Sequence, residues 1–299
     1  MSQAHAPAPH SDQDKYYIPH ESHWPIFGSI SLFTMMFGVI GWLNEWYPPY
    51  VFFLGLTLLV LMFIGWFRVV IGENQGGLYG KQGDRSFRMG MMWFIFSEVM
   101  FFAAFFGALL YARQFSVPWL SGEGAKIFNK LLLYKDFENV WPTNGPAKVG
   151  PRADGSFQII PAIGLPAINT AILLTSGITI TIAHHALREG KRGILNIFLF
   201  LTFVLGFLFV GLQAKEYVHA YHELGLQLST GIYGSTFFML TGFHGFHVTL
   251  GAIMLVCIWL RTLNGHFTPN KHFGFEAVAW YWHFVDVVWL GLFIFVYWL

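Results

Sequence analysis

The chain has 299 residues, of which 11% are charged and 55% are hydrophobic, whereas soluble domains carry about 25% charged residues. A soluble core of this length cannot hide so much apolar surface, so we expect most of the chain to lie in lipid. The formal net charge is +1, and no run of lysine or arginine is present, which argues against a nucleic-acid partner. The only cysteine, Cys257, excludes an internal disulfide, a multi-cysteine metal centre and a covalent haem motif. We expect it to be a small core residue.

The first 23 residues are polar and rich in Pro, His and Ser, and without an apolar segment they predict a mobile tail rather than a signal peptide. Seven stretches with almost no charge follow, each about 20 residues or longer, the length that crosses a hydrocarbon core about 30 Å thick. We expect spans at Trp24–Asn44, Trp46–Phe67, Met89–Ala112, within Gly155–Leu187 from Pro161 or Pro166, Gly193–Ala214, a long tilted helix from about Gly231 to Leu260, and Ala277–Leu299.

The sequence thus predicts an all-α polytopic membrane protein. We divide it into a tail (1–23), spans one and two (24–72), and spans three to seven (73–299), with a long outer loop at 113–160.

Basic residues predict the orientation, because basic loops stay on the cytoplasmic side. The short loops after spans two, four and six are basic, whereas the loop after span one has no basic residue and the loop after span five has only Lys215. The long loop after span three has six basic residues, which weakens this count without reversing it. We expect a cytoplasmic N-terminus and a C-terminus on the outer side.

Glu98 is the first candidate functional residue. It lies ten residues after Arg88, or about 15 Å along a helix, near the middle of the membrane, where an ionisable group is expensive. Its helix neighbours are apolar, so we expect a protonated carboxyl. A functional or lipid-linked role and a packing role, hydrogen-bonded to a neighbouring helix, both stay open. Candidate polar neighbours are Asp286, expected at a similar depth, and the pair His244 and His247.

Paired histidines also invite a haem or copper hypothesis, since His244 and His247 share one helix face and His184-His185 lies at the inner end of span four. Glu216 and His219 form a Glu-x-x-His pair, which di-iron bundles use twice, but this chain has it once and, by the limits above, at a loop edge. We therefore favour hydrogen-bonding histidines over a bound metal.

Two further patterns are structural. Trp280-Tyr281-Trp282-His283 is typical of an aromatic belt at a membrane interface. Span six also carries closely spaced glycines that allow close helix packing, against a partner or within the same bundle. These glycines are Gly231, Gly234, Gly242, Gly245 and Gly251.

Several motifs together are more specific than any of these patterns. They are Phe87-Arg88-Met89-Gly90-Met91 leading to Ser97-Glu98-Val99, Ala183-His184-His185, Tyr233 to Phe238 running into Thr241 to His247, and His272-Phe273-Gly274-Phe275-Glu276 running to Trp280 to Leu290. In these motifs the chain resembles subunit III of the haem-copper cytochrome c oxidases, from about Tyr16 to its end. It departs at Trp66-Phe67-Arg68-Val69, where family members often read Trp-Trp-Arg-Asp, so any role of that Asp is absent.

The resemblance implies a two-helix and a five-helix bundle with a lipid-filled cleft between them. It implies a non-redox subunit, not catalytic alone, that stabilises subunit I, holds phospholipid and supports proton uptake while O2 is reduced to water. Haem and copper would belong to subunits I and II, leaving this chain with bound phospholipids and no metal or other cofactor. Glu98 matches the family's membrane-buried glutamate, and Arg88 and Arg261 match positions associated with lipid head groups.

The implied partners are oxidase subunits I and II, membrane phospholipids, and cytochrome c as electron donor to the complex. The loop at 113–160 is longer than in compact mitochondrial versions, which favours a bacterial plasma membrane over the mitochondrial inner membrane. Two alternatives stay open. The first is the third subunit of a related quinol oxidase, but that subunit usually lacks the first two helices, so their presence favours cytochrome c as donor. The second is a proton-coupled transporter that uses Glu98 and His247.

Overall fold

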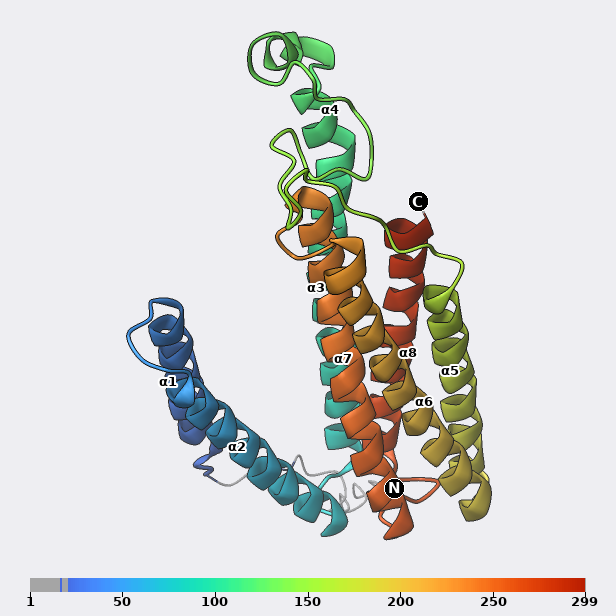
Figure 1. Cartoon of the computed structure of the whole chain (residues 1–299). Coiled ribbons are helices and arrows are strands. Elements are labelled where there is room, and N and C mark those ends of the chain that lie inside the picture. The colour runs from blue at the N-terminus through green and yellow to red at the C-terminus, as the bar shows by residue number, and fades with distance from the viewer. Residues whose placement is uncertain (1–16, 18–20, 299) are drawn as a thin grey trace, which may run out of the picture. The chain divides into compact units, whose positions relative to one another are not determined.

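The computed structural model describes residue 17 and residues 21–298. In this part of the chain, regular secondary structure is helical, apart from one short bridge between Thr268 and Lys271. Seven of its helical segments are long and apolar enough to cross a membrane, which confirms the all-α polytopic fold (Figure 1). They are Trp24–Leu43, Tyr50–Gln75, Lys81–Leu120, Leu165–Arg188, Arg192–Leu224, Gly231–Leu263 and Phe273–Trp298.

The chain divides into two compact units, Met1–Met89 and Gly90–Leu299, with the boundary inside α3 (Lys81–Tyr111). In the first unit, α1 (Trp24–Leu43) packs against α2 (Tyr50–Gln75). Glycine makes this contact close: a Cβ built at Gly38 would lie 2.3 Å from the backbone nitrogen of Phe52. Any larger residue there would push the two helices apart.

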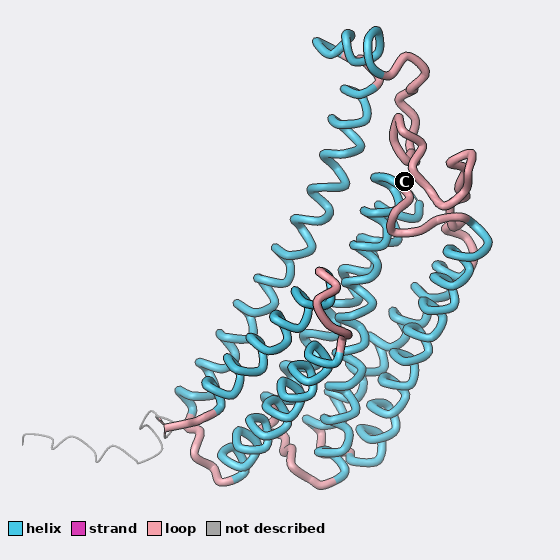
Figure 2. Tube along the Cα trace, turned by 60° about the vertical axis from the view of Figure 1, so that its left-hand side comes forward, coloured by secondary structure: helices cyan, strands magenta, loops and turns pink. Residues whose placement is uncertain are grey.

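The second unit contains α5 (Leu165–Arg188), α6 (Arg192–His219), α7 (Gly231–Leu263) and α8 (Phe273–Leu292), which lie side by side (Figures 1 and 2). Trp282 of α8 is fully buried, and its indole Nε1 donates a hydrogen bond to the Ser176 hydroxyl at 2.9 Å. A Cβ built at Gly206 or Gly251 would lie less than 3 Å from the Trp282 ring. One large ring thus fills space that two glycines leave open on neighbouring helices.

Several helices extend beyond the predicted spans. The second continues to Gln75, the third runs from Lys81 to Leu120 with a π-helical turn at Ala112–Ser116, and the fifth reaches Leu224 through another at Ala220–Leu224. Charged residues marked the ends of the predicted spans, but a helix can carry charges once it leaves the hydrocarbon region. The predicted loop at 113–160 is therefore helical up to Leu120, and it contains further short helical turns at Gly124–Lys126 and Asn129–Leu133.

Two local predictions were wrong. Tyr281 and Trp282 lie in the core instead of an interfacial belt, because the glycines of neighbouring helices accommodate their rings. Cys257 is exposed on the surface of the chain and is not a core residue, because that face of α7 points away from the neighbouring helices. Composition showed that these residues are apolar but could not show which side of the helix they occupy.

Candidate functional site

Glu98 and His247 meet inside the second unit. Glu98 lies on α3 and His247 on α7, and Nε2 of the imidazole is 2.9 Å from Oε2 of the carboxyl group. The two side chains are 22% and 11% exposed. The sequence neighbours of Glu98 offered no partner, but α7, which is distant in the chain, supplies one. This partner, His247, is one of the three candidate neighbours.

The hydrogen bonds of His247 determine where its protons lie. Its Nδ1 is 2.7 Å from the backbone carbonyl oxygen of Phe243. A carbonyl oxygen only accepts, so Nδ1 carries a hydrogen and donates it. Nε2 and the Glu98 carboxyl group must then share one further proton, held either as a neutral acid beside a neutral imidazole or as an ion pair. The site has the chemistry of a proton-holding pair.

Aromatic rings surround the histidine of the pair. The ring centroids of Phe102 and Phe101 lie 5.1 Å and 5.9 Å from that of His247, and Tyr281 stacks at 6.4 Å. The Tyr281 hydroxyl donates to the backbone carbonyl of His247 at 3.3 Å. Such an apolar enclosure strengthens the hydrogen bond between the two groups and disfavours a lone charge on either of them.

The other two candidate neighbours lie elsewhere. Nε2 of His244 donates to the backbone carbonyl of Val285 at 3.1 Å, and this histidine is 1% exposed. The carboxyl group of Asp286 lies 3.9 Å from Nδ1 of His283, and a Cβ built at Gly177 of α5 would lie 2.5 Å from its Oδ2. Among the interactions found in the described residues, neither group contacts Glu98. The spacing of Asp286 from Glu276 predicted its depth in the membrane, but depth does not determine in which direction the side chain points.

Sequence reasoning underrated Glu216, which it placed at a loop edge. Because α6 continues helically through Leu224, Glu216 lies inside a helix and is 3% exposed. Its Oε1 accepts hydrogen bonds from the Tyr297 hydroxyl at 2.6 Å and from the Gln213 amide at 3.1 Å. His219 instead is exposed and pairs with Glu223. The Glu-x-x-His pattern is therefore split between two environments. The spacing of Gln213 and Glu216 on one helix face was visible in the sequence, but Tyr297 was not.

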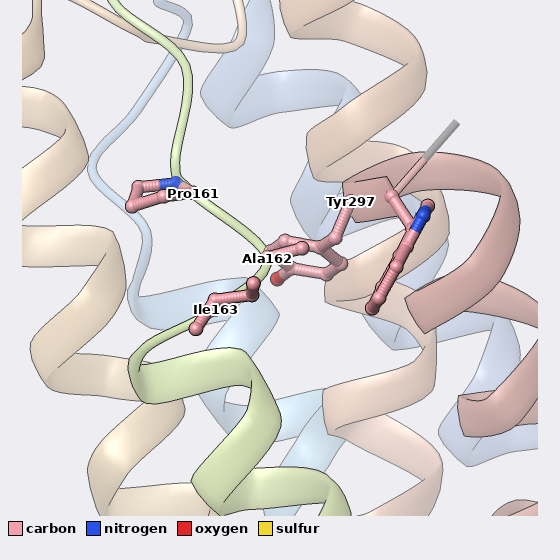
Figure 3. Close-up of a pocket in the computed structure, with 5 residues that line it drawn as sticks. Pro161, Ala162, Ile163 and Tyr297 are labelled. Carbon is pink, nitrogen blue, oxygen red and sulfur yellow. The ribbon is translucent and has the colours of Figure 1, made fainter.

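Tyr297 also lines an open surface pocket of about 310 Å³ beside this network. Figure 3 shows Pro161, Ala162 and Ile163 on one side of this pocket and Tyr297 on the other. The lining is mainly apolar, so the pocket suits an apolar group.

The two candidate lipid-binding arginines have different surroundings. Nε of Arg88 donates to the carboxylate of Asp84 at 2.8 Å, one turn earlier on α3, and Arg88 lies two turns inside this helix instead of opening it. The guanidinium of Arg261 lies 4.4 Å above the ring of Phe267, and its buried Nε has no hydrogen-bond partner among the described residues. Arg261 is therefore better able than Arg88 to bind an external anion.

The described residues thus form a multi-pass membrane fold with seven candidate spanning helices, and the second unit contains a carboxyl–imidazole pair. The sequence model of the family described as cytochrome c oxidase subunit III matches residues 14–120 and 147–299. The unmatched residues between these ranges fall in the segment between α4 (Val117–Leu120) and α5.

Curated relatives agree over nearly the whole chain. Cytochrome c oxidase subunit 3 of Dugong dugon is 41% identical over 95% of this chain and 96% of the relative. The proteins of the same name from Halichoerus grypus and Squalus acanthias are each 40% identical over the same shares. The chain therefore belongs to the cytochrome c oxidase subunit III family, and the sequence resemblance to that family is confirmed. Family membership makes it a multi-pass membrane subunit of a respiratory oxidase complex.

Proposed function

We propose that this chain is a non-redox subunit of a proton-pumping cytochrome c oxidase in a bacterial plasma membrane. It stabilises subunit I, holds phospholipid and supports proton uptake during the reduction of O2 to water. The haems and coppers lie in subunits I and II, and cytochrome c donates electrons to the complex. The N-terminus is cytoplasmic, and the C-terminus lies on the outer side.

The observation that carries the role in proton uptake is the Glu98–His247 pair. A carboxyl group and an imidazole 2.9 Å apart share one proton in an apolar enclosure, at a depth where an unpaired charge would be costly. Glu98 stays 22% exposed at the surface of this chain, so the pair is open to whatever packs against α3. That position suits a group that helps another subunit to keep a proton supply.

The test uses the whole complex purified in mild detergent. We expect the chain to copurify with haem-bearing partners, and the complex to oxidise cytochrome c and pump protons in vesicles. Glu98→Gln should lower the rate of proton uptake during turnover, while Glu223→Gln, which removes an exposed carboxylate of the same helical unit, should not. Equal rates in both variants and the native complex would contradict the role of the pair.

The same preparations separate the alternatives. Oxidation of quinol but not of cytochrome c would favour a quinol oxidase. Proton-coupled solute transport by the chain reconstituted alone would favour a transporter and overturn the proposal.

The orientation is tested by fusions after Leu299. An exported reporter should be active there and a cytoplasmic reporter inactive, because the basic loops hold the opposite side in the cytoplasm. The reverse pattern would contradict the proposed topology.

A further inference from the structure

A second group of histidines and a carboxylate lies apart from the Glu98–His247 pair. His184 lies just before the last turn of α5, His272 directly precedes α8, and Glu276 is in the first turn of α8. Figure 1 shows that the end of α5 and the start of α8 lie at the same end of the second unit. The ligand atoms of the three side chains all lie within 4.8 Å of one another.

The hydrogen bonds of His272 turn its Nε2 toward the carboxylate. Its Nδ1 lies 3.1 Å from the backbone carbonyl of Thr268, which only accepts, so Nδ1 carries the hydrogen. Nε2 of the neutral ring is then an electron-pair donor, and it lies 3.2 Å from Oε1 of Glu276. This Nε2 is buried and has no hydrogen-bond partner in the described residues, so in the neutral ring it can act as a ligand atom.

His184 brings a third electron-rich atom to the same place. Its Nε2 lies 3.7 Å from the same Oε1 of Glu276, and it too is buried without a hydrogen-bond partner among the described residues. The two imidazole nitrogens and Oε1 of Glu276 thus converge on one position. A metal cation can bind all of them at once.

Two of the three distances between ligand atoms are close to those of a zinc site, and the third is within 4.8 Å. Tetrahedral bonds of about 2.0–2.2 Å place neighbouring ligand atoms about 3.3–3.6 Å apart, and the two observed distances, 3.2 Å and 3.7 Å, lie on either side of this range. Two imidazoles and one carboxylate are a common zinc ligand set. A backbone carbonyl that accepts from the second ring nitrogen, as Thr268 does for His272, is the usual support of a metal-binding histidine.

We propose that His184, His272 and Glu276 bind one Zn²⁺ ion, with water in the fourth position. The side chain of His184 is 27% exposed, so this position can be reached from outside the helices. Zn²⁺ has no redox chemistry, so the site is separate from the electron-transfer metals that the proposed function assigns to other subunits. The ion ties the end of α5 to the start of α8 and stabilises the folded state.

The site is tested on the full chain in mild detergent. Bound metal is removed with a chelator, and the chain is then dialysed against a small excess of Zn²⁺. Elemental analysis should find about one zinc ion per chain, and zinc should raise the temperature of unfolding. Glu276→Gln, His272→Ala and His184→Ala should each weaken zinc binding by at least about 100-fold, since even the loss of a supporting group costs 10–100-fold. Far-ultraviolet circular dichroism without zinc shows whether each variant keeps its helices.

The matched control is His219→Ala. His219 and Glu223 have the same four-residue spacing as His272 and Glu276 and lie 3.0 Å apart, but both are exposed, and the described residues place no second histidine beside them. This variant should retain the zinc. Failure of the native chain to retain zinc, or equal retention by the native chain and Glu276→Gln, would overturn the proposal. Preferential retention of another divalent metal over zinc would overturn the identity of the ion.

Discussion

The Glu98–His247 pair and the His184, His272 and Glu276 group are built from the same parts but differ in what they can hold. In both, a histidine donates from Nδ1 to the backbone carbonyl four residues earlier and turns Nε2 toward a glutamate. In the first pair, Nε2 of His247 lies 2.9 Å from Oε2 of Glu98, which is a hydrogen-bond distance, and one proton satisfies both groups. At Glu276 a second imidazole competes for the same oxygen. The number of electron pairs converging on the carboxylate separates a proton site from a cation site.

The largest effect in this comparison should follow from the same substitution at both glutamates. Glu276→Gln removes the charge that a divalent cation needs, so zinc binding should fall by at least about 100-fold. Glu98→Gln keeps a donor facing Nε2 of His247, so the free energy of unfolding should change by less than about 1 kcal/mol. Zinc titration and chemical unfolding of both variants measure the contrast. A zinc affinity that responds to Glu98→Gln would show that the two sites are not distinct.

Removing the imidazole from the first pair should have the next largest effect. His247→Leu leaves the half-buried Glu98 carboxyl group without its hydrogen-bond partner, which costs about 1–3 kcal/mol of folding free energy. His219→Leu, at an exposed pair, is the control and should cost less than about 1 kcal/mol. The two variants are compared by unfolding in the same detergent. An equal loss in both would mean that the buried hydrogen bond contributes no more than the exposed one.

The location of the shared proton sharpens the same comparison. We expect the proton that the pair shares to lie on Glu98, since an apolar environment disfavours charges on the two groups. Infrared spectra should show a carboxylic C=O band that disappears in Glu98→Gln and shifts in His247→Leu. An ionised carboxylate band assigned to Glu98 at pH 7 would place the proton on His247 instead.

The sequence predicted much of this fold because its signals are local. The absence of charge over about 20 residues locates a span. Of the two predicted starts of the fourth span, Pro161 and Pro166, the second agrees with the helix start at Leu165, and the predicted start at Gly231 is confirmed. Span ends were less accurate, since Arg68 lies inside α2. A charge marks the edge of the hydrocarbon region and not the end of a helix.

The sites were harder to predict because their partners are distant in the chain. His247 lies 149 positions from Glu98, and Tyr297 lies 81 positions from Glu216. Each residue type was visible in the sequence, but the rotation of one helix against another determines which of them meet. Trp282 illustrates this limit: its pattern predicted a membrane interface, whereas glycines on two other helices place it in the core.

A smaller effect is expected on phospholipid binding by Arg88 and Arg261, because Arg88 is paired with a carboxylate, Asp84. Arg261→Ala should remove more tightly held phospholipid from the purified oxidase than Arg88→Ala, because Asp84 already takes one donor of Arg88 and repels phosphate. Arg261→Lys should restore only part of the lipid, since lysine cannot donate two parallel hydrogen bonds. Native mass spectrometry counts the lipids. Equal counts in the native complex and both alanine variants would assign the arginines to orientation alone.

The smallest effect is expected at a third glutamate, whose partners are hydroxyl groups instead of imidazoles. Tyr79 and Tyr17 donate to the two carboxylate oxygens of Glu73 at 2.5 Å and 3.2 Å. Burial, and then the hydrogen bond to Glu73, raise the pKa of Tyr79 above its ordinary value of 10.0. The folded chain therefore keeps this proton at a pH where the unfolded chain loses it, so the contribution of Tyr79 to stability is complete below about pH 10 and declines above it.

Tyr79→Phe should cost about 1 kcal/mol at pH 8, and the difference from the native chain should shrink as the pH rises from 10 to 11. Unfolding measured across this range checks the sign, and a difference that grows with pH would contradict it.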